Sequence, residues 1–488
     1  MARKILLAAT LVAAWVAGLS TLASAQFLMR SSLATLHGAN RVVVADFNRD
    51  GVMDLAVGAF EASSGVQVFL GNGDGTFKAP VAYAPGSGAA SLATADLNHD
   101  GNPDIVIANI AGDSVTVLLG NGDGTFQPPA SYAISSDFGG LVLGDFNNDG
   151  KIDICTTGTT TVAVIDVLLG NGDGTFQEPA IVTYPPNGGL DALTAGRFTE
   201  GGNLDIAVAD NEGLSGEVIQ ILQGNGDGTF SIGSSYGIDD AESIFAADLR
   251  NNGKTDLAVA GLESPGPAVL LGNGNGTFEQ PVYYHLGFNA LSVTVAVADM
   301  NGDGIPDLVS APTVGVGLID YSAVYVFPGN GDGTFGNPEV SYPVASISLP
   351  NGLALADFNG DGQLDVTIAD EFGHAGGVSE YVLLNTGRIK FSPFTPLSFK
   401  NQKQGTTSAP QTVTLTNEGK ASLSITSIKA TGAFGATSTC GKTVAAKAIC
   451  KISVTFSPKS AGASAGTVQI NDSASSKPQV IALSGKGN

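Results

Sequence analysis

The polar and apolar positions of this chain follow a long period, in which short apolar runs are separated by turns rich in Asp, Asn and Gly. Residues 42–45, 55–57 and 66–70 are largely apolar runs whose lengths and β-branched content predict strands. A loop of the form D-x-N-x-D-G-x-x-D follows the first run, and a Gly-Asn-Gly-Asp-Gly-Thr-Phe turn follows the third. Asn-Gly and Asp-Gly supply the positive φ angles of tight hairpins, so we expect a fourth, outer strand from Phe77.

The Asp loop recurs every 49 to 58 residues, and the turn recurs every 48 to 57 residues. The Asp loops, numbered one to seven here, occupy residues 46–54, 96–104, 145–153, 197–205, 248–256, 299–307 and 357–365. The turns occupy residues 71–77, 120–126, 170–176, 224–230, 272–278 and 329–335, with a degenerate copy at 385–391. A repeat of this length that holds about four strands predicts a β-propeller blade, and the count predicts seven blades. Tyrosines that recur in the outer strands are expected to pack between blades: Tyr83, Tyr132, Tyr184, Tyr236, Tyr284 and Tyr342.

The Asp loops carry oxygen side chains at positions 1, 3, 5 and 9 and glycine at position 6, as in Asp loop three. Alternating oxygen ligands on a glycine-bent loop suit a hard cation such as Ca²⁺. The loop is not an EF-hand, because position 12 of Asp loop three is Thr156 where that motif needs Glu. The alternative is a polar turn without metal, and the sevenfold recurrence favours the metal.

Five Asp loops keep the whole set of side chains. The predicted ligands are Asp46, Asn48, Asp50, Asp54, Asp96, Asn98, Asp100, Asp104, Asp145, Asn147, Asp149, Asp153, Asp299, Asn301, Asp303, Asp307, Asp357, Asn359, Asp361 and Asp365. Asp loop four has Arg197, Thr199 and Gly201 instead, so we expect no metal there, with the arginine in the cation's place. Asp loop five has Arg250 and Asn252 at positions 3 and 5, and we expect weak or absent binding.

These two motifs resemble the FG-GAP/VCBS repeats that form the blades of the integrin α-subunit propeller and its bacterial relatives. The resemblance covers about residues 27–391. It implies that position 7 of each metal loop adds a backbone carbonyl ligand, here from Val52, Asn102, Lys151, Ile305 and Gln363. It also implies that ligand binds on the face opposite the Asp loops. Candidates on that face are Asp210, Glu212, Asp239, Asp240, Glu371 and His374, which are otherwise solvated loop residues.

Residues 1–25 have the pattern of a secretory signal, with Arg3 and Lys4 before an apolar stretch and an Ala-Ser-Ala cleavage site ending at Ala25. No later run has the 18 or more apolar residues of a spanning helix. We therefore expect an exported protein without a transmembrane segment, secreted or at the cell surface. Residues 26–37 are expected to supply the outer strand of the seventh blade and so close the ring, with 388–395 as the competing segment.

Charge separates the chain into two parts. Residues 26–395 hold 43 Asp and Glu against 10 Lys and Arg, a formal charge of −33, whereas residues 396–488 have a formal charge of +8. Clustered carboxylates would repel one another in a compact ring unless cations bind there. Such acidity argues against nucleic acid as a partner, because phosphates would meet no compensating charge.

The repeats stop at Pro396, and residues 396–488 show short alternating runs that predict a β-sandwich. Their motifs at 397–399, 413–417, 431–434, 454–458 and 483–485 resemble the immunoglobulin-like ASPM/SPD-2/Hydin class. Cys440 and Cys450 flank a short loop of this exported part and are expected to form a disulfide. Cys155, on a predicted inner strand, is expected to be a buried free thiol.

The sequence thus predicts an all-β protein, a seven-bladed β-propeller (26–395) followed by an immunoglobulin-like β-sandwich (396–488). It carries no H-E-x-x-H, Walker or G-x-S-x-G motif, and its four histidines are scattered. We expect a secreted, calcium-stabilised, non-catalytic binding or adhesion protein with a protein or glycan ligand. The alternatives are a propeller enzyme acting on extracellular polysaccharide through paired carboxylates, and a passive surface or matrix scaffold.

Overall fold

The computed structural model describes residues 27–488 with short gaps. The gaps are 36–37, 60–64, 85–87, 111, 136–138, 160–162, 185–189, 200–201, 211–216, 239, 263, 287–289, 292–293, 302–303, 317–318, 338, 345–348, 361, 375–377, 386–388, 393–396, 418–421 and 473–478. The expected signal, residues 1–25, lies outside the described residues. Every regular element of the described chain is a β-strand, as the all-β prediction required.

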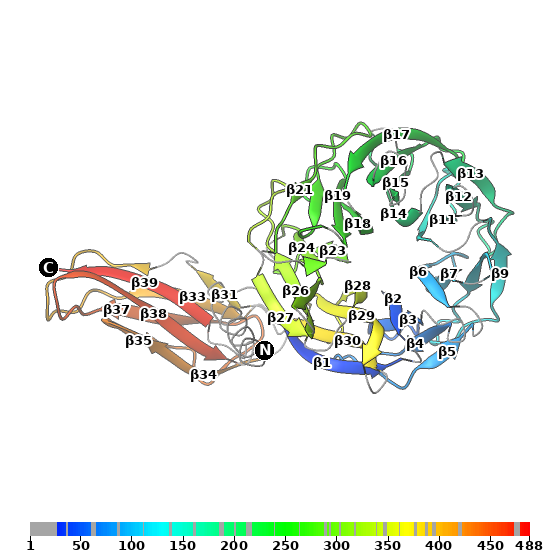
Figure 1. Cartoon of the computed structure of the whole chain (residues 1–488). Helices are drawn as coiled ribbons and strands as arrows, with labels where there is room; N and C mark the ends of the chain where they lie inside the picture. Colours follow the sequence, from blue (N-terminus) through cyan, green and yellow to red (C-terminus); the bar gives the residue numbers. More distant parts are fainter. Residues whose placement is uncertain are drawn as a thin grey trace, which may run out of the picture.

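The described residues between 27 and 385 form seven antiparallel sheets arranged in a ring (Figure 1). Sheet one comprises β2 (Ala39–Ala45), β3 (Asp54–Ala59), β4 (Val66–Phe69) and β5 (Val81–Tyr83). Sheet two comprises β6 (Ala89–Ala95), β7 (Asp104–Asn109), β8 (Ser114–Leu118) and β9 (Ala130–Ala133). Sheet three comprises β10 (Leu141–Gly144), β11 (Asp153–Thr159), β12 (Ala163–Leu168) and β13 (Ala180–Tyr184).

The next two sheets repeat this order from the centre outward. Sheet four comprises β14 (Leu190–Gly196), β15 (Asp205–Asp210), β16 (Val218–Gly224) and β17 (Phe230–Gly237). Sheet five comprises β18 (Ala241–Ala247), β19 (Asp256–Gly261), β20 (Ala268–Leu270) and β21 (Val282–Tyr283). In all five sheets the first strand ends just before an Asp loop, and the second strand starts at its position-9 aspartate.

Sheet six carries an extra hairpin. It comprises β22 (Ala290–Leu291), β23 (Val295–Ala298), β24 (Asp307–Ser310), β25 (Thr313–Val316), β26 (Ile319–Phe327) and β27 (Glu339–Val344). The pairing of β25 with β26 and with β22 extends the sheet beyond the four-strand plan. This hairpin lies within the longest interval between Asp loops, the 58 residues from 299 to 357.

Sheet seven joins the two ends of the ring. It comprises β28 (Pro350–Ala356), β29 (Asp365–His374), β30 (Val378–Asn385) and the N-terminal strand β1 (Phe27–Ala34). β1 pairs antiparallel with β30 from Phe27 opposite Asn385 to Ala34 opposite Val378. The N-terminal segment therefore supplies the outer strand of the last sheet, as predicted. The competing segment, β31 (Ile389–Ser392), pairs with β33 (Gln411–Asn417) of the C-terminal part instead.

The apolar core of the ring lies between neighbouring sheets. Seven clusters of buried side chains occupy the seven intervals, and Leu55 of sheet one shares a cluster with Val382 of sheet seven. The second strands β3, β7, β15 and β19 are buried along their whole length. A strand that is covered on both faces needs a continuous apolar run, which explains the sequence pattern after each Asp loop.

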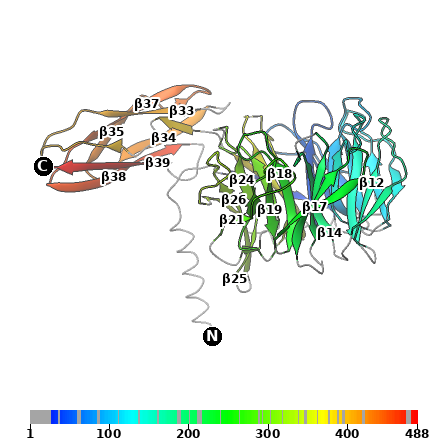
Figure 2. The ribbon, with the colours of Figure 1, turned by 90° about the horizontal axis from the view of Figure 1, so that it is seen from above.

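The C-terminal residues form two facing sheets beside the ring (Figures 1 and 2). One contains β31, β33, β37 (Ile449–Phe456) and β35 (Phe434–Ser438). The other contains β32 (Leu397–Ser398), β39 (Gln479–Gly487), β38 (Gly462–Asp472), β34 (Leu423–Ala430) and β36 (Thr443–Val444). Cys440 and Cys450 form the predicted disulfide, and Cys155 is buried in the ring as a free thiol. Strand pairing of this unit begins at Ile389, before the composition changes at Pro396.

Candidate metal centre and ligand cavity

Asp loops one, two and three are described completely and share one geometry. In Asp loop one the backbone N–H of Asp50 donates to Asp46 Oδ1 (3.1 Å) and to Asn48 Oδ1 (2.9 Å). The N–H of Gly51 donates to Asp46 Oδ2 at 2.8 Å. The oxygens of positions 1 and 3 are thereby held beside each other at the exposed end of the loop. Position 6 needs glycine, because its φ is +85° at Gly51.

The aspartate at position 9 is buried in every Asp loop and joins the loop to the following turn. Asp54 Oδ2 accepts the N–H of Phe47 at 2.9 Å, and Oδ1 accepts the N–H of Gly71 at 2.7 Å. Asp54 is 0% exposed. The same pair of bonds recurs at Asp104, Asp153, Asp205, Asp256, Asp307 and Asp365. The sequence pattern predicts this residue as a metal ligand. In the structure its carboxylate accepts one N–H from the Asp loop and one from the following turn, and so connects the two motifs.

The position-9 carboxyls are perturbed by burial and by their neighbours. The pKa of Asp54 is raised to about 6: burial is the largest cause, the carboxylates of Asp50 and Asp46 also raise it, and the two backbone N–H donors oppose the shift. Burial with the corresponding neighbours likewise raises the pKa of Asp104 to about 6. Negative side chains therefore lie close enough to act on one another. A bound cation would relieve this repulsion.

The donor types fit calcium, since they are carboxylate and amide oxygens. Within the described residues, however, no group of three or more His, Cys, Asp or Glu side chains is arranged to hold a metal ion. Asp303 of Asp loop six and Asp361 of Asp loop seven lie outside the described residues. In those two loops Gly304 and Gly362 donate their N–H groups to Asp299 and Asp357, as in the complete loops. Calcium thus stays a prediction.

Asp loops four and five depart from this geometry in different ways. In Asp loop four Arg197 is exposed, and the buried hydroxyl of Thr199 has no hydrogen-bond partner among the described residues. In Asp loop five Arg250 Nη2 donates to Asp256 Oδ1 at 2.5 Å, and Nε donates to Oδ2 at 3.2 Å. Nη2 also donates to the carbonyl of Gly272 at 2.6 Å. The guanidinium that contacts a position-9 carboxylate is therefore in Asp loop five, where we did not predict it.

Successive sheets are tied together on the Asp-loop side of the ring. The N–H of Gly124, in the turn of sheet two, donates to the carbonyl of Phe47 in Asp loop one at 3.1 Å. Arg49, with a φ of +57°, reaches Asn102 of Asp loop two at 3.3 Å. Equivalent ties join Gly75 to Phe358, Gly228 to Phe146, Gly276 to Phe198, Asn148 to Asn203 and Asn251 to Gly304. No sequence motif had assigned this role to position 4.

The predicted tyrosine packing is confirmed where the side chains are described. Tyr83, Tyr132, Tyr236 and Tyr284 each meet the phenylalanine of the next turn edge-on, with ring centroids 5.0–5.8 Å apart. The side chains of Tyr184 and Tyr342 lie outside the described residues. In the turns themselves, Asp74 Oδ1 accepts both the N–H and the hydroxyl of Thr76. The turn aspartate is thus used within its own turn.

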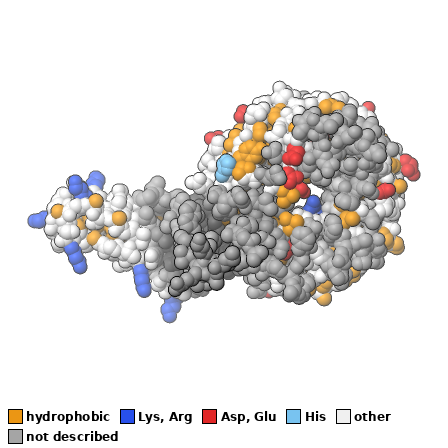
Figure 3. Space-filling model, viewed as in Figure 1, with side chains coloured by type: hydrophobic (Ala, Val, Ile, Leu, Met, Phe, Trp, Pro, Cys, Tyr) orange, Lys and Arg blue, Asp and Glu red, His pale blue; other side chains and the backbone are white. Residues whose placement is uncertain are grey.

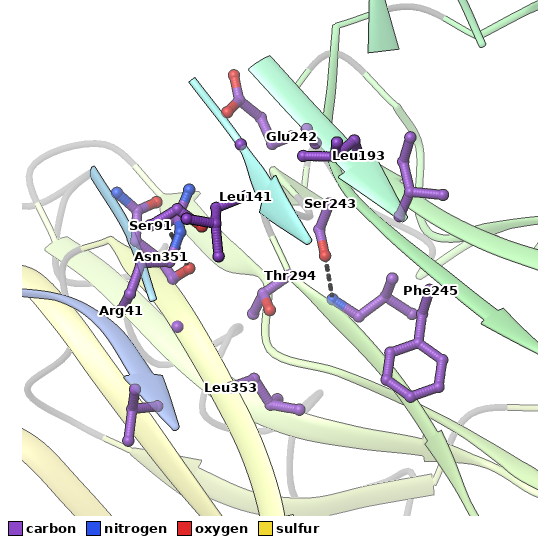
Figure 4. Close-up of a pocket in the computed structure, with 16 residues that line it drawn as sticks. Arg41, Ser91, Leu141, Leu193, Glu242, Ser243, Phe245, Thr294, Asn351 and Leu353 are labelled. Carbon is purple, nitrogen blue, oxygen red and sulfur yellow. Dashed lines mark hydrogen bonds between the residues drawn. The ribbon is translucent and has the colours of Figure 1, made fainter. Parts of the chain in front are cut away.

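A cavity of about 200 Å³ lies at the centre of the ring (Figures 3 and 4). All seven sheets contribute to it through their innermost strands or the residues just before them. Its polar lining includes Arg41, Ser91, Glu242, Ser243, Thr294 and Asn351. These residues precede or begin strands that run toward the Asp loops, so the cavity lies nearer the opposite face. Figure 3 shows charged side chains of both signs at the centre of the ring.

One wall of the cavity is a hydrogen-bond network across three sheets. Arg41 Nη1 donates to the carbonyl of Asn351 at 2.8 Å and to that of Asn40 at 3.1 Å. Asn351 Nδ2 donates to Asn40 Oδ1, and Asn40 Nδ2 donates to the carbonyl of Ala89. Sheets seven, one and two are linked in this way. On the facing side in Figure 4, Glu242 and Phe245 come from β18, and Phe245 is 38% exposed.

The ligand-face residues predicted from sequence are not the residues that line this cavity. Asp210 ends β15 on the expected face but is only 2% exposed, so its side chain is turned into the ring. Asp240 is half-buried, and its N–H donates to Glu217 at 2.7 Å. Glu212 and Asp239 lie outside the described residues, as do the side chains of Glu371 and His374 on β29. Arg41, Glu242 and Phe245 belong to no sequence motif. They line one cavity only because the ring closes, so no pattern in the sequence indicated them.

Comparison with protein families decides the repeat type. The model of the FG-GAP-like repeat matches residues 46–107, 98–156, 145–208, 248–310 and 314–368. The chain belongs to the FG-GAP-like repeat family. The model of the ASPM-SPD-2-Hydin (ASH) domain, described as abnormal spindle-like microcephaly-associated, matches residues 388–480. This match starts at the strand β31 that pairs into the C-terminal sheets. The FG-GAP ring is thus followed by an ASH domain of the immunoglobulin-like class.

Curated relatives resemble only part of the FG-GAP protein. Phosphatidylinositol-glycan-specific phospholipase D of Rattus norvegicus is 34% identical over 155 residues, which are 27% of this chain and 18% of the relative. The Homo sapiens protein of the same name is 34% identical over 158 residues, or 28% and 19%. The chain therefore spans less than a fifth of the length of these relatives.

Solved structures show weaker likeness. BBS1N, from its complex with ARL6DN, is 11% identical with a TM-score of 0.49, and the match covers 74% of this chain and 98% of that one. The V. cholerae biofilm matrix protein Bap1 is 12% identical with a TM-score of 0.42, and the match covers 74% and 91%. In the described part of the FG-GAP chain, no helical segment has the length and apolar character needed to cross a bilayer.

Proposed function

We propose that this FG-GAP protein is a non-catalytic, extracellular binding protein of the adhesion type. In this proposal its seven sheets are the blades of a closed β-propeller, and the ligand is a protein or glycan. Ligand binds at the central cavity, on the face away from the Asp loops. The observation that carries the proposal is the cavity itself, because residues from all seven sheets converge there. Ligand sites are concave and mix apolar surface with a few placed polar groups, as this one does.

The composition of the cavity favours binding over polysaccharide hydrolysis. Among its described lining residues, Glu242 is the single carboxylate. Glycoside hydrolysis uses a pair of carboxyl groups, about 5–10 Å apart. The thiol of Cys155 is 0% exposed, and burial raises its pKa further above its ordinary value, which disfavours a nucleophilic thiolate.

We further propose that Ca²⁺ binds Asp loops one, two, three, six and seven and stabilises the ring. The mutual repulsion of Asp46, Asp50 and Asp54 supports this, since a cation bound only to the folded state adds to its stability. Hydrogen bonds between the loops and turns of neighbouring sheets would couple the stability of each loop to that of the next sheet. None of the described residues that line the cavity belongs to these loops, so the metal would act on ligand affinity through the rigidity of the fold.

An array of glycans and matrix proteins, probed with and without EGTA, tests the proposal. We expect saturable binding that is lost in EGTA and strongly reduced by Phe245→Ala and Glu242→Gln. The matched control is Ile232→Ser, because Ile232 is 59% exposed on the outer strand β17, away from the cavity. Release of sugar from a polymer would instead favour the enzyme alternative. Ligand binding that is unchanged in both Phe245→Ala and Glu242→Gln would refute the proposed site.

A further inference from the structure

Asp loop five differs from the complete Asp loops in its own charges. Asp loop three has Asp145, Asp149 and Asp153 against Lys151. Asp loop five balances two carboxylates, Asp248 and Asp256, with Arg250 and Lys254. The side chain of Lys254 donates to the carbonyl of Asn273 in the following turn at 2.9 Å. The fifth loop is therefore neutral by itself, whereas Asp loop three keeps an excess of negative charge.

Arg250 places a positive charge against the position-9 carboxylate, which is one of the predicted cation ligands. Its guanidinium donates to both oxygens of Asp256 and to the carbonyl of Gly272, at 2.5–3.2 Å. Two of these acceptors belong to a carboxylate that is 0% exposed, and the Arg250 side chain is 17% exposed. A bidentate contact of this kind fixes orientation as well as charge. At the equivalent place, Asn147 of Asp loop three accepts the N–H of Asp149 and contributes no cation.

The stem of Arg250 also packs across the boundary to the next sheet. A side chain added at Gly333, in the turn of sheet six, would come within 3.1 Å of Arg250 Cγ. Gly333 has a φ of +86° and lies against Leu271 as well. Arg250 thus joins its own loop, its own turn and the neighbouring turn, which are the parts that the loop must hold together.

We propose that the Arg250 guanidinium is the resident cation of Asp loop five, so that this loop takes no calcium and keeps its fold when calcium is removed. The loop retains the remaining oxygens of a metal site: Asp248 at position 1, Asn252 at position 5 and Asp256 at position 9. Asp248 accepts the N–H of Asn252 and of Gly253, as Asp46 does in Asp loop one. Replacing Arg250 with the asparagine of the other loops should therefore restore a calcium-dependent loop. The proposal extends the calcium part of the proposed function.

A reciprocal exchange in the full chain tests this assignment. Arg250→Asn removes the side-chain cation from Asp loop five, and Asn147→Arg introduces one into Asp loop three. Calcium stoichiometry is measured by isothermal titration with Ca²⁺, and thermal stability by circular dichroism in EGTA and in Ca²⁺. We expect Arg250→Asn to bind one more equivalent than the wild type and to lose roughly 5 °C of Tm in EGTA, recovered in Ca²⁺. We expect Asn147→Arg to bind one equivalent fewer and to melt higher than the wild type in EGTA.

The outcomes separate this proposal from calcium binding by the other loops. An unchanged Tm of Arg250→Asn in EGTA overturns it, whatever the wild-type stoichiometry. If the wild type binds no calcium, the proposal that calcium stabilises the ring is refuted. The role of Arg250 is then still decided by the Tm of the two variants in EGTA, for which we expect shifts of opposite sign. Arg250→Lys serves if Arg250→Asn does not fold, because it keeps the charge and loses the bidentate contact. We expect it to bind no extra calcium and to melt between the wild type and the predicted Arg250→Asn value.

Discussion

Asp loops three and five occupy the same place in two sheets of one ring, separated by sheet four, yet their side-chain charges differ. In Asp loop three the backbone N–H groups of Phe146 and Gly170 hold Asp153, and the carboxylates of Asp149 and Asp145 raise its pKa in addition to burial. In Asp loop five burial raises the pKa of Asp256 as well, and the guanidinium of Arg250 opposes that rise. Two positions account for the difference in charge: position 3 is Asn147 in one loop and Arg250 in the other, and position 5 is Asp149 in one and Asn252 in the other.

The largest difference in stability between the two loops should follow removal of the position-9 carboxylate. Asp153→Ala leaves two buried backbone donors without their acceptor, and we expect a loss of ~2–3 kcal/mol in EGTA. Asp256→Ala does the same and also leaves the Arg250 guanidinium without its counter-ion, so we expect a loss of ~3–5 kcal/mol. Urea denaturation in EGTA measures both. Equal losses of stability in the two variants would mean that the Arg250 guanidinium does not stabilise the contacts of Asp256.

The next largest effect should be a pH dependence of stability, caused by the buried position-9 carboxyls of Asp loops one and two. Asp54 and Asp104 have folded-state pKa values raised to about 6 from 3.8, so the protonated carboxyl is favoured in the folded state. In EGTA their contribution is therefore complete below about pH 3.8 and is lost as the pH rises through about 6, at most roughly 3 kcal/mol for each group. We expect the ring to melt higher at pH 5 than at pH 7 in EGTA. Asp54→Asn should flatten this dependence, and a ring that is more stable at pH 7 in EGTA would contradict it.

Calcium should stabilise through the predicted metal loops, which have asparagine at position 3. At a concentration about 100 times its Kd, one bound ion adds roughly 2.7 kcal/mol. Asp145→Asn with Asp149→Asn in Asp loop three should remove one such increment from the calcium-dependent rise in Tm. Asp248→Asn with Asn252→Ala in Asp loop five should leave that rise as it is. The comparison fails if both double variants reduce the calcium effect equally.

The smallest difference concerns the lysines at position 7. Lys151 pairs with Asp149 at 3.2 Å, but both side chains are more than a third exposed, so Lys151→Ala should cost less than about 0.5 kcal/mol. Lys254 donates to a backbone carbonyl of the following turn, so Lys254→Ala should cost about 0.5–1 kcal/mol. Thermal unfolding in EGTA would resolve the two, and a larger cost at Lys151 would reverse the expected order.

The local sequence determined the parts of this protein and their order. The spacing of the Asp loops and turns predicted the strands of each sheet, because glycine permits the positive φ angles that these loops and turns require. The apolar runs after each loop predicted strands, and the structure shows β3 and β7 among them buried along their whole length. Cys440 with Cys450 predicted the disulfide. Phe27, in register with the phenylalanines of the turns, indicated that the N-terminal strand completes the last sheet.

Only the tertiary structure decided which side chains meet. Arg41 and Asn351 are 310 residues apart, and closure of the ring places them on one wall of the cavity. Arg250 contacts Asp256 within its own loop, whereas Arg49, whose backbone φ is +57°, reaches Asn102 of the next loop. β31 could have paired with either unit, and the ASH domain takes it because β1 already covers the edge of β30. Periodicity fixes local conformation, whereas contacts between distant repeats depend on how the whole ring closes.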